Sequence, residues 1–333
     1  MLPYVGFPLV RACPLRCRYC GIGAEAAASD VATVDLRTLR QWAESSLRLG
    51  IRKFRLTGGE PLLHPEIAEI LSYFSNLDAT CTLNTAAFLI DRRTDIFEGL
   101  GPSLTVICSL DALDETRFDR ITGSRGWYKP TIKGIQFLAR LRLLKRLNMM
   151  VIKENVDAIQ DMIQFCSALG CNLKISDIAR TPDQFGDWHA DHVDLSEIER
   201  SLSSIATSVT KHPYTQLYGI PSKIYTVSGV EITIKSSANG TTYAIPGPCS
   251  TCAHFPCEEG MYFINVLPDG TASACRQNMV HVMGMPDDFE GTIKRMIDLI
   301  RGTVLLDRKA LAAQCAVGGT SQSIGPNSAK FNG

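Results

Sequence analysis

Three cysteines near the start of the chain have the spacing of iron–sulfur ligands. The segment Cys13-Pro14-Leu15-Arg16-Cys17-Arg18-Tyr19-Cys20 reads CxxxCxxC and follows the apolar run 4–10. A four-iron cubane takes one ligand per iron, so three thiolates leave one iron open to another ligand. A zinc loop is the alternative, and it is disfavoured because no second CxxC or histidine pair follows at short range. The spacing predicts a [4Fe-4S] cluster with one open iron.

A glycine-rich motif follows the next predicted strand. The segment Leu56-Thr57-Gly58-Gly59-Glu60-Pro61-Leu62 would be an ordinary turn by itself, in which two glycines let backbone approach a ligand closely. Together with the cysteine loop, it resembles the GGEP motif of the radical S-adenosylmethionine (SAM) superfamily. The resemblance implies that SAM chelates the open iron, that Gly58, Gly59 and Glu60 receive its amino group, and that Tyr19 belongs to the cofactor site.

Polar residues at later strand positions are further candidates for the SAM site. By the same resemblance, Asn84 and Ser109 would contact the ribose or carboxylate of SAM, and Arg146 would lie near a carboxylate partner. Each has a simpler interpretation, because polar residues at strand ends often form turns or cap helices.

The composition is that of a globular protein with no global charge. The chain has 333 residues, of which 45% are hydrophobic, with 34 basic and 34 acidic side chains. Balanced charge disfavours nucleic-acid and membrane-surface partners, and the length favours about two domains. We expect a cytoplasmic protein, because the chain enters its first strand within the opening residues and has no apolar run of membrane-spanning length.

Short β-branched runs alternate with amphipathic segments over the first half of the chain. This alternation predicts an α/β fold with a parallel sheet, whose ligands lie at the carboxyl ends of the strands. The resemblance implies the particular form, a partial (β/α)6 TIM barrel. The predicted strands are 4–10, 53–57, 79–84, 104–110, 147–152 and 173–176, and the predicted helices are 36–49, 65–74, 131–144, 158–169 and 195–209.

A second group of cysteines lies near the other end of the chain. Cys249, Cys252 and Cys257 precede two extended arms around Pro268-Asp269-Gly270, and Cys275 follows. This arrangement resembles SPASM and twitch domains, and its few cysteines match the shorter twitch form. The resemblance implies a C-terminal twitch domain with an auxiliary [4Fe-4S] cluster. We expect a barrel at 1–210, a connecting segment at 211–245 and the auxiliary domain at 246–333.

Five cysteines are available for an auxiliary cluster that takes four. The resemblance assigns Cys252, Cys257, Cys275 and Cys315 as ligands and leaves Cys249 as a free thiol. The spacing alone does not decide between Cys249 and Cys252. Alternatively, Cys249 ligates and Cys315 is a buried helix residue, or the cluster keeps an open iron for substrate.

A free thiol beside a carbon radical can return a hydrogen atom, because an S–H bond is weaker than a sugar C–H bond. Abstraction from one face and return to the other inverts a stereocentre. On this basis the chain resembles the radical SAM epimerases of aminoglycoside biosynthesis. The resemblance implies conversion of neomycin C to neomycin B by inversion at C5‴, with Cys249 as the donor and a flavodoxin- or ferredoxin-type reductant.

Such a substrate is polycationic, so we expect carboxylates around it. The candidates are Asp177, Asp183, Asp187, Glu258 and Glu259.

Two other enzyme classes and one non-enzymatic class compete with the epimerase. One is a peptide-modifying radical SAM enzyme, since twitch and SPASM domains often serve peptides. Another is a GTP 3′,8-cyclase of molybdenum cofactor synthesis, whose paired-glycine tail is only weakly echoed by Gly318-Gly319. An iron–sulfur scaffold is disfavoured, because a scaffold does not need to hold SAM.

Overall fold

The computed structural model describes residues 2–20, 33–179, 188–212, 221–258, 260–275, 282–283, 288–307 and 310. Its centre is a twelve-stranded sheet in the order β13-β12-β11-β1-β2-β3-β4-β5-β6-β9-β8-β7. The strands are β1 (Val5–Pro8), β2 (Lys53–Thr57), β3 (Thr80–Thr85), β4 (Leu104–Ser109), β5 (Leu144–Met150), β6 (Asn172–Ser176), β7 (Ser208–His212), β8 (Ser222–Val227), β9 (Val230–Lys235), β11 (Ile264–Val266), β12 (Ala272–Ser273) and β13 (Val282–Met283).

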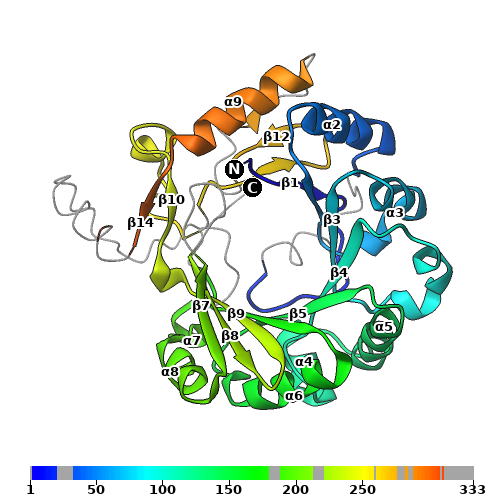
Figure 1. Ribbon diagram of the computed structural model, residues 1–333, viewed down its shortest axis with the longest axis vertical. Coiled ribbons are helices and arrows are strands. Elements are labelled where there is room, and N and C mark those ends of the chain that lie inside the picture. Colours follow the sequence, from blue (N-terminus) through cyan, green and yellow to red (C-terminus); the bar gives the residue numbers. More distant parts are fainter. Residues whose placement is uncertain are drawn as a thin grey trace, which may run out of the picture.

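The middle of the sheet is parallel and its two arms are antiparallel. Strands β1 to β6 pair in parallel, as do β1 with β11 and β6 with β9, whereas the β7–β8, β8–β9, β11–β12 and β12–β13 pairs are antiparallel. The sheet curls into an open ring (Figure 1). Its two edge strands do not pair with each other in the described part of the chain. The predicted α/β class with a parallel core is confirmed, and the barrel is not closed.

The helices lie outside the ring and cover the apolar face of the sheet (Figure 1). They are α2 (Leu36–Arg48), α3 (Ile67–Ser75), α4 (Glu115–Thr122), α5 (Tyr128–Arg140), α6 (Ile159–Leu169), α7 (Trp188–Asp191), α8 (Ser196–Ile205) and α9 (Phe289–Arg301). Since successive strand residues face opposite sides, Leu56, Leu147 and Leu173, each 0% exposed, pack beneath the helices. The strand residues that alternate with these leucines therefore face the inside of the ring.

Helix α9 packs against helix α2. The rings of Trp42 in α2 and Phe289 in α9 meet edge to face at 4.9 Å, and Arg48 Nε pairs with Glu290 Oε1 at 2.5 Å. A small separate sheet pairs β10 (Thr241–Tyr243) with β14 (Val304–Leu306). None of the helices in the described ranges has the length and apolar character of a membrane span.

Most predicted elements fall within a few residues of the observed ones, and the predicted hairpin around Pro268-Asp269-Gly270 is confirmed by the antiparallel β11–β12 pair. Strand β5 starts at Leu144 rather than at 147, because Lys145 and Arg146 interrupt the apolar pattern from which the strand was predicted. Helices α4, α7 and α9 were not predicted. One sheet runs through all three expected segments, and the division at 210 and 245 stays a prediction.

Candidate active site

The cysteine loop is fixed on one side by the glycine motif after β2. The Gly59 amide donates to the Val10 carbonyl at 2.7 Å, and the Glu60 amide donates to the Ala12 carbonyl at 2.8 Å. A Cβ at Gly58 would lie 2.5 Å from the Val10 oxygen, and one at Gly59 would lie 2.2 Å from the Ala12 oxygen. Both glycines are therefore required for the two loops to pack.

The end of α4 fixes the cysteine loop on its other side. The amides of Arg16 and Arg18 donate to the carbonyls of Thr122 and Ile121 at 2.8 and 3.1 Å. Gly123 ends the helix in the left-handed conformation, with φ of 58°. A Cβ on Gly123 would lie 2.7 Å from the Arg16 oxygen. The loop that carries the three cysteines is thus held between two rigid elements.

The three cysteines line a cavity of about 220 Å³ at the carboxyl ends of β1 to β4. Most of the predicted SAM-site residues line it too. These are Tyr19, Gly58, Gly59, Asn84 and Ser109, and the cavity is completed by Leu15, Thr57, Thr85, Ala86, Asp111, Phe118 and Thr122. The Asn84 Oδ1 atom is buried without a hydrogen-bond partner among the described residues. This unpaired acceptor at the cavity fits a ligand that donates a hydrogen bond.

Glu60 lies behind this cavity and does not line it. Its carboxylate is 0% exposed and accepts hydrogen bonds from Thr85 Oγ1 at 2.6 Å, the Ala86 amide at 2.8 Å and the Leu62 amide at 3.1 Å. Burial raises the pKa of Glu60 to about 7. The side chain thus ties the loop after β2 to the loop after β3, and its predicted contact with SAM is untested.

Asp111 lines the cavity and was given no role from the sequence. The Tyr19 hydroxyl donates a hydrogen bond to its carboxylate, and the Met150 amide donates another at 2.8 Å. Burial raises the pKa of Asp111 to about 6. Its position at the end of β4, beside the candidate Ser109, was the signal available in the sequence.

Burial disfavours the charged forms of Cys13 and Cys17 in the cavity. Burial raises the pKa of Cys13 to about 12 and that of Cys17 well above its usual value, and the neighbouring Cys20 adds to both increases. Thiolates at this site therefore need positive charge beside them, which iron supplies. No group in the described ranges is compact enough to hold a single metal ion.

The second cysteine group also surrounds one pocket. Cys249, Cys252, Cys257 and Cys275 all line it, and the remaining lining residues are Thr242, Tyr243, Pro248, Phe255, Gly260 and Met261. Burial, followed by the other three thiols, raises the pKa of Cys249 to about 11. Its Sγ lies 3.8 Å from Met261 Sδ. Cys249 is thus one of a group of four, and Cys315 lies outside the described residues.

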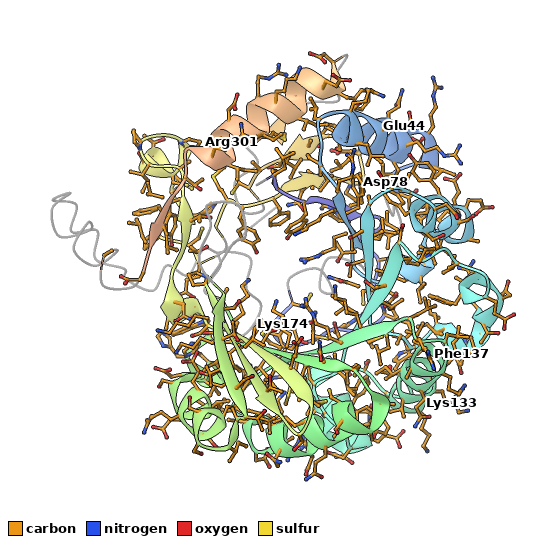
Figure 2. All side chains as sticks on the ribbon, viewed as in Figure 1. Glu44, Asp78, Lys133, Phe137, Lys174 and Arg301 are labelled. Atoms are coloured by element: carbon orange, nitrogen blue, oxygen red, sulfur yellow. The ribbon has the colours of Figure 1, made fainter. Side chains whose placement is uncertain are left out.

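Arg55 (β2), Arg146 (β5) and Lys174 (β6) face the inside of the ring, one position from outward-facing leucines. Figure 2 shows Lys174 on this inner side. Within the described ranges, no carboxylate is recorded within ion-pair distance of these three cations. Burial, and then Arg55, lowers the pKa of Arg146 to about 10. Burial, and then Lys235, Arg146 and Arg55, lowers the pKa of Lys174 well below its usual value. Arg146 is therefore in this inner cation group, outside the SAM cavity.

Of the five carboxylates expected around a cationic substrate, the structure describes Asp177 and Glu258. Asp177 is buried and accepts hydrogen bonds from the Ser237 amide at 2.8 Å and from the hydroxyls of Ser236 and Ser237, so it holds the turn after β9. Glu258 lies beside Cys257. Asp183, Asp187 and Glu259 lie outside the described residues.

Residues 7–166 match the model of the Radical SAM superfamily. The matched segment carries the cysteine loop and the glycine motif, and the superfamily implies a [4Fe-4S] cluster and SAM. Two solved structures share its fold. Streptococcus suis SuiB has a TM-score of 0.61 at 18% identity over 90% of this chain and 67% of its own, and anSMEcpe with bound AdoMet has a TM-score of 0.59 at 14% identity over 90% and 84%.

Similar curated proteins are named GTP 3′,8-cyclases. The Microcystis aeruginosa enzyme is 39% identical over 161 residues, which span 45% of this chain and 48% of that protein. A probable GTP 3′,8-cyclase of Pyrococcus abyssi is 24% identical over 310 residues, or 90% of this chain and 94% of that protein. The first match thus spans about half of its relative, and the second spans nearly all.

These relatives correct the predicted activity. The prediction of an aminoglycoside epimerase close to neomycin C epimerase is wrong, because the relatives are named for a reaction of GTP. The predicted polycationic substrate is wrong for the same reason, and the inner surface of the ring carries cations. The role of Cys249 as a hydrogen donor was part of the epimerase prediction and loses its basis with it.

Proposed function

We propose that this chain is a radical SAM enzyme of the GTP 3′,8-cyclase type, acting on a nucleoside triphosphate. The observation that carries this proposal is the group of inward-facing cations Arg55, Arg146 and Lys174. Partly buried cations without counter-ions are costly, and a bound polyphosphate would supply the missing negative charge. A polycationic sugar would be repelled from the same surface.

The cations are also placed to bring a substrate beside SAM. Arg55 precedes the cavity residue Thr57 by two positions on the same face of β2, a separation of roughly 7 Å. Asn148 pairs with the cavity residue Ser109 on one side and with Lys174 on the other. A nucleotide held by its phosphates inside the ring would thus extend toward the SAM cavity.

In this proposal, one set of residues would bind the cofactors and another set would orient the substrate. Cys13, Cys17 and Cys20 would bind three irons of the first cluster, and the glycine motif and Asn84 would hold SAM against the fourth. The bound cofactors supply one-electron cleavage of SAM to a 5′-deoxyadenosyl radical, and an external reductant provides the electron. The inner cations would fix the triphosphate, so that the same sugar carbon always meets that radical.

We assign the four cysteines of the second pocket, Cys249, Cys252, Cys257 and Cys275, to an auxiliary [4Fe-4S] cluster in a twitch-type domain. The support is their shared pocket, which provides one thiol for each iron, and the burial that disfavours free thiolates there. This assignment matches the alternative in which Cys249 ligates, with Cys315 not required.

Turnover of GTP tests the proposed function. Reconstituted protein with SAM, a low-potential reductant and GTP should form 5′-deoxyadenosine together with loss of GTP, and neomycin C should not replace GTP. Arg146→Gln should raise the KM for GTP about tenfold or more, because a partly buried charge-assisted contact is lost. Lys145→Gln is the matched control, since Lys145 is the exposed neighbour on the same strand. No GTP loss with intact clusters would refute the proposal.

A further inference from the structure

A fourth cation, Lys235, reaches the inner surface of the ring from β9. In the parallel pairing of β6 with β9, Lys174 lies opposite Thr233 and Ser176 lies opposite Lys235. Lys235 is therefore on the same inner face as Lys174, two positions further toward the carboxyl end of the sheet. Strand β9 lies beyond residues 7–166, so Lys235 is an addition to the part that matches the superfamily.

The side chain of Lys235 lies across the ring against an aromatic group. Its Nζ is 5.8 Å from the centre of the Tyr262 ring, and Tyr262 comes just before β11 on the opposite arm of the sheet. Tyr262 meets Tyr4 edge to face at 6.4 Å. Arg55 stacks over Tyr4 at 4.5 Å, and its NH1 donates to the Tyr4 hydroxyl at 3.2 Å. Two tyrosines thus separate the cations of β2 and β9.

We propose that Lys235 is a phosphate-binding residue that makes the site select substrates by the length of their polyphosphate chain. This inference rests on the anionic substrate of the proposed function. A cation over a ring face is held more weakly than a cation that donates hydrogen bonds to phosphate, so Lys235 can exchange the Tyr262 ring for a ligand.

The selection follows from where the cations lie. Arg55, Arg146 and Lys174 lie on β2, β5 and β6 and would serve the first phosphates of any nucleotide, and Lys235 is the cation that acts most strongly on Lys174. Among the four cations Lys235 comes last in the strand order β2, β5, β6, β9, counted from the strands that line the SAM cavity, so it would contact only a longer chain. Removing the Lys235 charge should therefore weaken the binding of triphosphates far more than the binding of monophosphates.

Binding of simple phosphates tests this assignment apart from catalysis. Reconstituted enzyme without reductant is titrated calorimetrically with inorganic tripolyphosphate, orthophosphate, GTP and GMP. Lys235→Gln should lower the affinity for tripolyphosphate and GTP about tenfold, and the affinity for orthophosphate and GMP less than about twofold. Lys235→Arg should restore most of the loss and shows that the variant site is intact.

Lys223→Gln is the matched control on the neighbouring strand β8. Lys223 pairs with Glu199 of α8 and therefore belongs to the outer, helix-covered face. This variant should bind all four ligands as the wild type does.

The possible results separate the two proposals. Equal affinity of Lys235→Gln and wild type for tripolyphosphate, equal weakening of long and short phosphates, or no polyphosphate binding by the wild type would each overturn the role of Lys235. If tripolyphosphate binds in a Lys235-dependent way while GTP is never consumed, the cation assignment stands and the cyclase proposal fails.

Discussion

At the scale of single residues, the site depends on buried groups whose charge is set by their surroundings. Glu60 keeps three hydrogen-bond donors satisfied behind the SAM cavity, and Lys174 stands among cations inside the ring. Glu60 and Lys174 each need a hydrogen-bonding or charged partner. Leaving such a polar group unpaired costs more free energy than forming the pair contributes.

Glu60→Ala should destabilise the fold by about 2 to 4 kcal/mol, because it leaves Thr85 Oγ1 and the amides of Leu62 and Ala86 without their acceptor. Urea unfolding measures the change. Glu66→Ala is the control at a partly exposed carboxylate nearby and should cost less than about 1 kcal/mol. Equal losses for the two variants would show that Glu60 does not tie the loops together.

The affinity for GTP should fall as pH rises through the lowered pKa of Lys174. The pKa of Lys174 is lowered in the free protein, and a polyphosphate favours its charged form, so binding above that pKa requires proton uptake. Below that pKa the amine is already charged and the dependence ends. Lys174→Arg should flatten the profile, because guanidinium stays protonated. An unchanged profile in this variant would assign the dependence to another group.

At the scale of elements, the cysteine loop is positioned by backbone contacts on both sides. The glycine motif and the end of α4 leave no space for side chains where they meet it. This packing explains why short motifs were informative in the sequence. The glycines are required because two backbone segments approach each other closely. A short stretch of sequence is enough to encode such a requirement.

Gly123→Ala should reduce the content of the first cluster, because the new methyl group would lie 2.7 Å from the Arg16 oxygen and displace the loop. Gly170→Ala is the matched control. Gly170 also ends a helix in the left-handed conformation, but nothing lies within 4 Å of its added Cβ. Both variants should lose about 1 kcal/mol from backbone strain, and only Gly123→Ala should lose iron. Full iron content in Gly123→Ala would argue against this positioning.

At the scale of the whole molecule, the sheet brings together residues that are far apart in the chain. The cysteine loop, the glycine motif and the fold class could be predicted because each is encoded within a short window. The inner cation group could not, since its members lie on four strands: Arg146 was expected in the SAM site, and Arg55, Lys174 and Lys235 each resemble a solvated residue in their own segments. The placement of Cys249 among four thiols also needed the fold, because spacing alone allowed two assignments.

Iron content tests the second cluster. Cys249→Ala should lower iron from about eight to about four atoms per chain, since an incomplete ligand set no longer retains the auxiliary cluster. Cys81→Ala, at a buried cysteine of β3 outside both pockets, should keep the full content. Retention of all the iron by Cys249→Ala would show that Cys249 is not a required ligand.

The central claim is that a radical formed from SAM reacts with a nucleoside triphosphate held inside the ring. The most direct measurement is the transfer of deuterium from GTP labelled at C3′ into 5′-deoxyadenosine, analysed by mass spectrometry. The account predicts one deuterium in the 5′-deoxyadenosine formed with each GTP consumed. Unlabelled 5′-deoxyadenosine, formed at the same rate with or without GTP, would contradict it.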